Sequence, residues 1–170
     1  MATDFQEHIQ EQAGSESIGS MQLVSFHLGD ETFGVEITRV REIILMCDIT
    51  HVPQSPPYVK GLFNLRSTVI PVVDLRSLFG LAETNSDSES RIMVMQVGSR
   101  TIGIIVDGVD EVLRISKNDI APPPPTVAGL KHDYLTGLVR QESGLLILLD
   151  IERVLDGDTR TGLEVVANDL

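Results

Sequence analysis

The amino-acid sequence contains an internal duplication, and no other feature limits its possible folds as strongly. The stretch around Gly34 aligns without a gap with the stretch around Gly103, 69 residues later. The stretch around Gly61 aligns in the same way with that around Gly137, 76 residues later. Further matched pairs are Gly29 and Gly98, Val35 and Ile104, Glu42 and Glu111, Ser67 and Ser143, and Asp74 and Asp150. The chain is therefore expected to contain two copies of one structural unit.

Each copy reads as a β-hairpin, a connector, a second hairpin and a short helical turn. In the first copy, apolar and polar residues alternate on both sides of a turn at Gly29-Asp30-Glu31, which predicts a hairpin. A second hairpin is predicted around Arg66-Ser67. Residues 38–42 are predicted to form one helical turn, and Leu75–Phe79 another, ended by Gly80.

The second arm of this second hairpin has an unusual composition. Residues 69–73 are apolar nearly throughout, which predicts a strand that is buried on both faces. Pro71 lies inside this run and cannot donate a backbone hydrogen bond, so it predicts an edge position or a bulge.

About five short strands in each copy, with almost no helix, are typical of a small β-barrel. A chain of 170 residues suits one domain and can bury roughly 70% of its unfolded surface. We therefore expect an all-β fold in which two small barrels share a core, with short helical turns. Chance similarity between hydrophobic hairpins is the alternative explanation, and the shared glycines argue against it. The expected units are a leader at 1–20, copies near 22–80 and 91–156, an acidic linker at 82–90 and a tail at 158–170.

The formal net charge of −12 lies mostly outside the two copies. Residues 1–20, 82–90 and 156–170 hold eleven of the 25 acidic residues but one of the 13 basic residues. No basic stripe is present, which argues against a nucleic-acid partner. No apolar run approaches the ~20 residues that span a bilayer, and the N-terminus does not resemble a signal peptide. We therefore expect a cytoplasmic protein without direct membrane insertion.

The residues that usually carry chemistry do not form a recognisable site. The four histidines are scattered, without metal-ligand spacing, and no glycine-rich phosphate loop precedes a helix. Cys47 has no cysteine partner and no basic neighbour, and we interpret it as an inert apolar filler. Asp74 and Asp150 would suit an acid–base pair, but each precedes a short helix, where a capping role is the simpler explanation. Neither an enzyme nor a cofactor or metal site is expected.

The tip of the second hairpin is the candidate docking surface. Arg66 stands there beside Leu62 and Leu65, and arginine is common in binding hot spots. The alternative is a solvated arginine in a turn. The duplication favours a function, because the position equivalent to Arg66 is Glu142, so the two tips have diverged on similar frames.

Several motifs, taken together, resemble one known family. They extend in unbroken order over about residues 21–157, and the chain is similar over this range to CheW, the coupling proteins of bacterial chemotaxis. The motifs are Gly29-Asp30-Glu31, 33–35, 40–43, 59–66, 69–76, 103–109 and 134–138.

This resemblance implies two intertwined five-stranded SH3-like β-barrels and a non-catalytic adaptor function. The adaptor would couple transmembrane chemoreceptors to the histidine kinase CheA, by contacts with the kinase regulatory domain and with the cytoplasmic tip of a methyl-accepting receptor. By motif match, the receptor-binding residues would be Val40, Glu42, Gly61 and Arg66.

Two departures from the family pattern affect these expectations. The family usually has glycine where this chain has Ser67, so the hairpin turn is expected to differ, and the run Pro122–Pro125 replaces a more mixed stretch near the kinase. Two alternatives stay open: a coupling protein of a non-flagellar chemosensory system, and a small β-barrel enzyme or ligand-binding protein.

Overall fold

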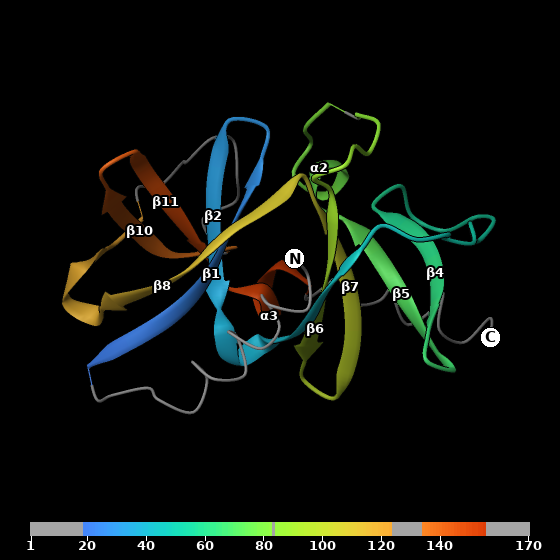
Figure 1. The fold of residues 1–170 in the computed structure, drawn as a ribbon, viewed down its shortest axis with the longest axis horizontal. Coiled ribbons are helices and arrows are strands. Elements are labelled where there is room, and N and C mark those ends of the chain that lie inside the picture. Colours follow the sequence, from blue (N-terminus) through green and yellow to red (C-terminus); the bar gives the residue numbers. More distant parts are fainter. Residues whose placement is uncertain (1–18, 83, 124–133, 156–170) are drawn as a thin grey trace.

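The computed structural model describes residues 19–82, 84–123 and 134–155, and regular structure in these ranges is almost entirely β-strand. The described residues contain two α-helices of four residues each and two 3₁₀ turns. The strands form two sheets that lie side by side along the long axis of the molecule (Figure 1). The expectation of an all-β fold with short helical turns is confirmed.

The order of elements repeats as the sequence predicts. The first copy contains β1 (Ser20–Leu28), β2 (Glu31–Glu36), η1 (Ile37–Arg39), β3 (Val40–Leu45), β4 (Val59–Leu65), β5 (Thr68–Asp74) and α2 (Leu75–Leu78). The second contains β6 (Arg91–Val97), β7 (Arg100–Val106), β8 (Gly108–Ser116), η2 (Lys117–Asp119), β9 (Ile120–Ala121), β10 (Leu135–Gln141), β11 (Gly144–Leu149) and α3 (Ile151–Val154).

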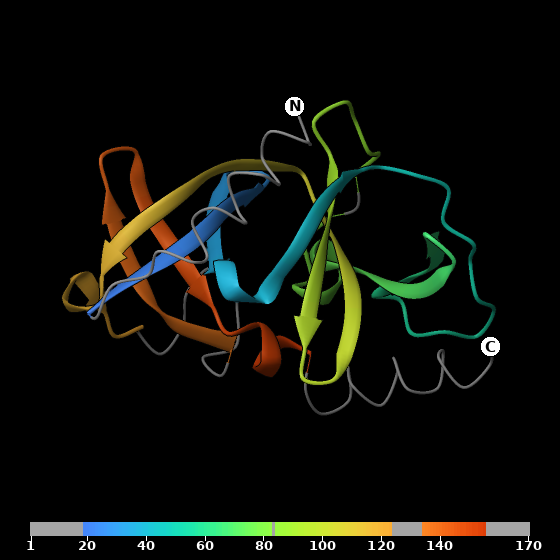
Figure 2. The ribbon, with the colours of Figure 1, turned by 60° about the horizontal axis from the view of Figure 1, so that its bottom comes forward.

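The two copies exchange strands. One sheet has the order β3-β6-β7-β5-β4 and the other β8-β1-β2-β11-β10-β9. Each sheet therefore takes a hairpin from one copy and the later strands from the other, in the same relative order. Figures 1 and 2 show the chain passing between the sheets twice, after β2 and after β7. The intertwined arrangement is confirmed, and one sheet has a sixth strand because the two-residue β9 pairs with β10.

The parallel strand pairs of the two sheets are formed by equivalent positions of the repeat. Strand β5 runs parallel to β7 with Val72 opposite Gly103, and β11 runs parallel to β2 with Leu148 opposite Gly34. The two glycines are equivalent in the repeat. A Cβ on Gly34 would lie 2.9 Å from Leu146 Cδ2, and one on Gly103 would lie 2.9 Å from Ile92 Cγ2. The shared glycines therefore let the second strand of each hairpin pack closely inside its sheet.

Three groups of buried apolar side chains make up the core. Each sheet encloses its own small group, and these groups occupy equivalent positions: Leu23, Val139, Leu146 and Leu148 in one sheet match Ile92, Phe63, Ile70 and Val72 in the other. The largest group lies between the sheets and includes Phe26, Phe33, Met95 and Ile102. The prediction that the two copies share a core is confirmed.

Two details of the first copy differ from the expectations. The helical turn predicted at 38–42 is a 3₁₀ turn at Ile37–Arg39, after which the chain enters β3. A register shift between Val40 and Glu42 interrupts the period-two alternation of this strand, which makes its apolar spacing resemble a helix. Cys47 is exposed, so its interpretation as an apolar filler is wrong.

Strand β5 is buried on both faces only in its second half, where the successive residues Val72 and Val73 are both fully buried. In its first half Ile70 is buried but Val69 is 45% exposed. Strand β5 is a central strand, but its pairing with β7 begins only at Val72. Pro71 thus lies just before the ladder with β7 starts, where a missing backbone donor removes no hydrogen bond of that ladder.

The two aspartates that precede the short helices are helix caps. A carboxylate oxygen of Asp74 accepts a hydrogen bond from the Arg76 backbone N–H (3.0 Å). Asp150 accepts from the backbone N–H groups of Glu152 (3.2 Å) and Arg153 (3.3 Å). These contacts confirm the capping interpretation.

Ion pairs tie each short helix to the corner where the chain changes sheets. Arg76 donates to Asp107 with Nη2–Oδ2 at 2.6 Å, and Asp107 also accepts from the Gly29 N–H at 2.6 Å. At the equivalent corner, Arg39 Nη1 donates to Glu152 Oε1 at 2.6 Å. Arg76 and Glu152 are equivalent positions of the repeat, so the polarity of the ion pair is reversed between copies.

Candidate functional site

The tip of the hairpin β4–β5 has a strained backbone. Arg66 and Ser67 form its two-residue turn with φ angles of +48° and +72°. Positive φ at both central residues matches the type I′ turn, whose twist suits an antiparallel hairpin. Ser67 thus keeps the left-handed conformation that glycine adopts more easily. Among the described residues outside glycine, only these two and Gln54 have positive φ, so the tip of the second copy has a different turn.

Arg66 forms an ion pair within its own chain. Its side chain is 71% exposed, and its Nη1 donates to Glu42 Oε1 at 3.1 Å while Nη2 donates to Oε2. The hydrogen bonds that Arg66 donates to Glu42 raise the pKa of its guanidinium. Glu42 is on β3 and Arg66 follows β4, and these strands are the two edges of the five-stranded sheet. The pair therefore joins the edges where the sheet curls round on itself.

Gly61 makes a close backbone contact near the same junction between the edge strands β3 and β4, which we call the seam. Its φ is +148°, and a Cβ at this position would lie 2.1 Å from the carbonyl oxygen of Thr50. Thr50 and the neighbouring Leu62 exchange two backbone hydrogen bonds of 2.8 and 2.9 Å. The segment between β3 and β4 can approach β4 this closely only because residue 61 has no side chain. Gly61 therefore has a structural reason to be glycine that is independent of any partner.

Val40 is buried rather than presented at the surface. Its side chain is 7% exposed, it pairs with Met95 on β6, and it belongs to the core between the sheets. Of the four residues predicted from the motifs, the structure brings Glu42 and Arg66 into contact. Gly61 lies on the adjoining strand, and Val40 supports β3 from the core side.

Two exposed apolar residues on this sheet were not singled out by the sequence. Leu45 at the end of β3 is 59% exposed and Val69 on β5 is 45% exposed. The alternation of a strand at residues 40–45 does not reveal the exposure of Leu45, because it places Leu45 on the same face as the buried Ile43. The exposure of Val69 was not predicted, because this residue lies in an apolar run that predicted full burial. Its equivalent in the second copy, Leu145, is also exposed.

The site is a surface suited to binding rather than to bond making. It combines a guanidinium with several N–H donors, a half-buried carboxylate and nearby apolar side chains, which are typical components of a protein interface. Among the described residues, no group of three or more His, Cys, Asp or Glu side chains is arranged to hold a metal ion. No helix in the described part of the chain is long and apolar enough to cross a membrane.

Comparison with known proteins decides the family. The model of the CheW-like domain matches residues 22–159 of this chain. The chain belongs to the CheW family. It is 37% identical to chemotaxis protein CheW of Treponema pallidum over 137 residues, which cover 78% of this chain and 81% of the relative. It is 36% identical to the Klebsiella aerogenes CheW over 152 residues, covering 89% of this chain and 91% of that protein.

A solved structure agrees with the fold. The scaffolding protein TtCheW from Thermoanaerobacter tengcongensis superposes with a TM-score of 0.75 at 31% identity, covering 82% of this chain and 90% of that one. The chain is thus a chemotaxis adaptor of the CheW type with the family's all-β fold. Membership in a family of scaffold proteins also supports the prediction that it is not an enzyme.

Proposed function

We propose that this chain couples transmembrane chemoreceptors to the histidine kinase CheA. Family membership over nearly all of the described fold carries the proposal. The relative from Thermoanaerobacter tengcongensis is a scaffolding protein, which supports a role in assembly. Its partners would be the CheA regulatory domain and the cytoplasmic tip of a methyl-accepting receptor. The chain would act in the cytoplasm and join receptor arrays through these partners, without inserting into the membrane.

The proposed receptor-binding surface is the seam of the five-stranded sheet. Arg66 and Glu42 would make the direct contacts, since the Arg66 side chain is 71% exposed and its partner Glu42, at 16%, is still partly accessible. Gly61 and Val40 would act by positioning, because Gly61 holds the seam closed and Val40 anchors β3 in the core. The flagellar or non-flagellar nature of the pathway depends on which receptor and kinase bind, and a pull-down that identifies both would decide it.

Charge reversal at Arg66 tests this assignment. Arg66→Glu places a carboxylate beside Glu42 and is expected to weaken receptor binding and kinase activation at least tenfold while the fold stays intact. The matched control is Glu142→Arg at the equivalent tip of the second copy, which should leave receptor binding unchanged. Binding is measured by co-sedimentation with receptor-containing membranes, activation by CheA autophosphorylation, and folding by circular dichroism.

A double variant separates an internal from an external role of the ion pair. Glu42→Arg combined with Arg66→Glu restores the attraction within the chain but reverses its charges toward a partner. A receptor contact predicts that the double variant stays defective, whereas a purely internal role predicts recovery. Normal receptor binding and kinase activation by a folded Arg66→Glu variant would overturn the assignment.

A further inference from the structure

The repeat creates two equivalent pockets at the corners where the chain changes sheets. One is lined by Glu36, Arg39, Thr136, Leu148, Leu149, Asp150, Ile151 and Glu152, with a volume of about 190 Å³. The other, of about 30 Å³, is lined by Lys60, Asp74, Arg76, Thr84, Asn85, Ser86, Ser90, Ile105 and Asp107. Lys60 matches Thr136, Asp74 matches Asp150, Arg76 matches Glu152 and Ile105 matches Glu36 under the offsets of the duplication.

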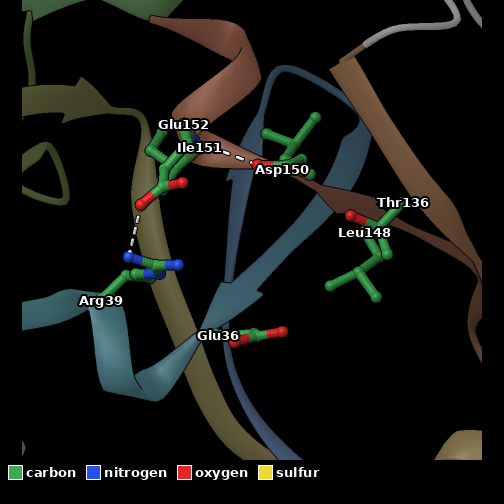
Figure 3. Close-up of a pocket in the computed structure, with 8 residues that line it drawn as sticks. Glu36, Arg39, Thr136, Leu148, Asp150, Ile151 and Glu152 are labelled. Carbon is green, nitrogen blue, oxygen red and sulfur yellow. Dashed lines mark hydrogen bonds and ion pairs between the residues drawn. The ribbon is translucent and has the colours of Figure 1, made fainter. Parts of the chain in front are cut away.

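The smaller pocket is covered by the chain itself. Thr84, Asn85, Ser86 and Ser90 belong to the linker that leads from α2 back to β6, and they form one wall of it. Residues 84–86 have no helical or strand structure and carry small polar side chains. An irregular, polar segment thus fits this type of pocket. The larger pocket has no such cover among the described residues, and Figure 3 shows it between β2, β10 and α3.

The two pockets differ in charge. The covered pocket balances Lys60 and Arg76 against two aspartates, Asp74 and Asp107. The open pocket is lined by three carboxylates and one guanidinium, that of Arg39. Arg39 is committed to Glu152, to which its Nη1 donates at 2.6 Å.

Glu36 has no cationic partner for its carboxylate among the described residues of the open pocket. It stands at the end of β2, across the pocket from Asp150 and Thr136 (Figure 3). Its side chain makes no cap hydrogen bond to η1, and no other described residue pairs with it. In the covered pocket the equivalent position is the apolar Ile105, so only the open pocket has a carboxylate at this position.

We propose that the open pocket binds a basic, extended peptide segment of a partner protein. The segment would lie as the linker lies in the covered pocket, with a Lys or Arg side chain beside Glu36. Charge complementarity selects a basic occupant, because the lining has more carboxylates than cations. The volume suits one or two side chains and is below that of a typical small-molecule pocket. The pocket is separate from the Arg66 surface, which lies on the other sheet, so the proposal does not depend on that assignment.

The test uses the full-length protein and fluorescein-labelled peptides of alternating lysine and serine. Fluorescence anisotropy is expected to show saturable binding that weakens at high salt, and a glutamate–serine peptide of equal length should not bind. Glu36→Gln removes the unpaired carboxylate and is expected to weaken binding at least tenfold. Thr136→Lys places in the open pocket the ammonium group that the covered pocket has at Lys60, and it should block binding.

The control separates this site from general attraction to an acidic protein. Glu31 is exposed at the other end of β2, so Glu31→Gln removes the same charge from the same strand outside the pocket. It should leave peptide affinity within twofold of the unchanged protein. Equal losses for Glu31→Gln and Glu36→Gln, or no binding of the lysine peptide, would overturn the proposal. A folded Arg66→Glu variant should bind the peptide normally, so failure at one surface is distinguishable from failure at the other.

Discussion

Replacing Gly61 with alanine is expected to destabilise the fold strongly, because the new Cβ would occupy space already filled by the backbone. The carbonyl oxygen of Thr50 lies 2.1 Å from the Cβ position, and the φ of +148° is one that side-chain-bearing residues rarely adopt. Relief requires the segment at Thr50 to move away from β4. That movement breaks the two hydrogen bonds that Thr50 exchanges with Leu62.

The expected loss of unfolding free energy is the sum of the backbone strain and the two lost hydrogen bonds. Backbone strain at such a φ costs roughly 1–3 kcal/mol. Two hydrogen bonds at about 0.5–1.5 kcal/mol each add roughly 1–3 kcal/mol. The free energy of unfolding should therefore fall by about 2–6 kcal/mol, which is a large share of the 5–15 kcal/mol typical of a domain.

Gly98→Ala is the matched control. Gly98 also has a positive φ, +60°, but a Cβ there would meet nothing within 4 Å. Its cost is therefore the left-handed backbone penalty alone, about 1–2 kcal/mol. Urea unfolding of both variants, followed by circular dichroism, measures the difference. A Gly61→Ala variant no less stable than Gly98→Ala would refute the argument that Gly61 is required for closure of the seam.

Four further substitutions test other parts of the fold. Asp74→Ala and Asp150→Ala each remove a helix cap and should lower the free energy of unfolding by about 0.5–2 kcal/mol in urea titrations. Hydrogen bonds from Arg76 hold the pKa of Asp107 below its usual range. The ionised Asp107 therefore contributes stability above about pH 4, the usual range of aspartate, and this contribution is lost as the pH falls through the lower, folded-state pKa. Acid titration of Asp107→Asn should show a weaker loss of stability in that region. Ser67→Gly relieves a left-handed residue at the tip and should raise the melting temperature slightly, with no change in partner binding.

The hairpins could be predicted because their signals are local. A glycine or a short polar turn between two alternating runs specifies a hairpin from a dozen residues, as around Gly29 and Arg66. The helical turn predicted at 38–42 was misplaced: the turn is the 3₁₀ turn Ile37–Arg39, and β3 begins at Val40. The register shift between Val40 and Glu42 accounts for the near-helical spacing of the buried residues Val40 and Ile43 within the strand. Such a bulge depends on the partner strand β6, which lies far along the chain.

The exchange of strands between copies could not be derived from the repeat. Each copy contains all five strand types, so a sheet built within one copy has the same local signals as a sheet built from both. What differs is long-range pairing, such as Val72 with Gly103 and Leu148 with Gly34. The intertwined fold was therefore available only by resemblance to the family. In the same way, the exposure of Arg66 was predictable, but its pairing with Glu42 was not, because it depends on the two sheet edges meeting.

Divergence between the copies explains how a duplicated fold can serve as an adaptor. Two identical copies would present the same surface twice, and a scaffold that joins unlike partners needs surfaces that differ. The frames stay alike, with equivalent glycines, caps and parallel strand pairs. The surfaces of the two copies differ. Arg66 is equivalent to Glu142 in the repeat, and the neutral, covered pocket is equivalent to the open pocket with its free carboxylate. Each difference lies where a change costs little core packing, at a turn or at a corner between sheets. The exposed positions of the two copies are therefore the places where partner specificity is expected, and the buried positions are where changes should affect stability.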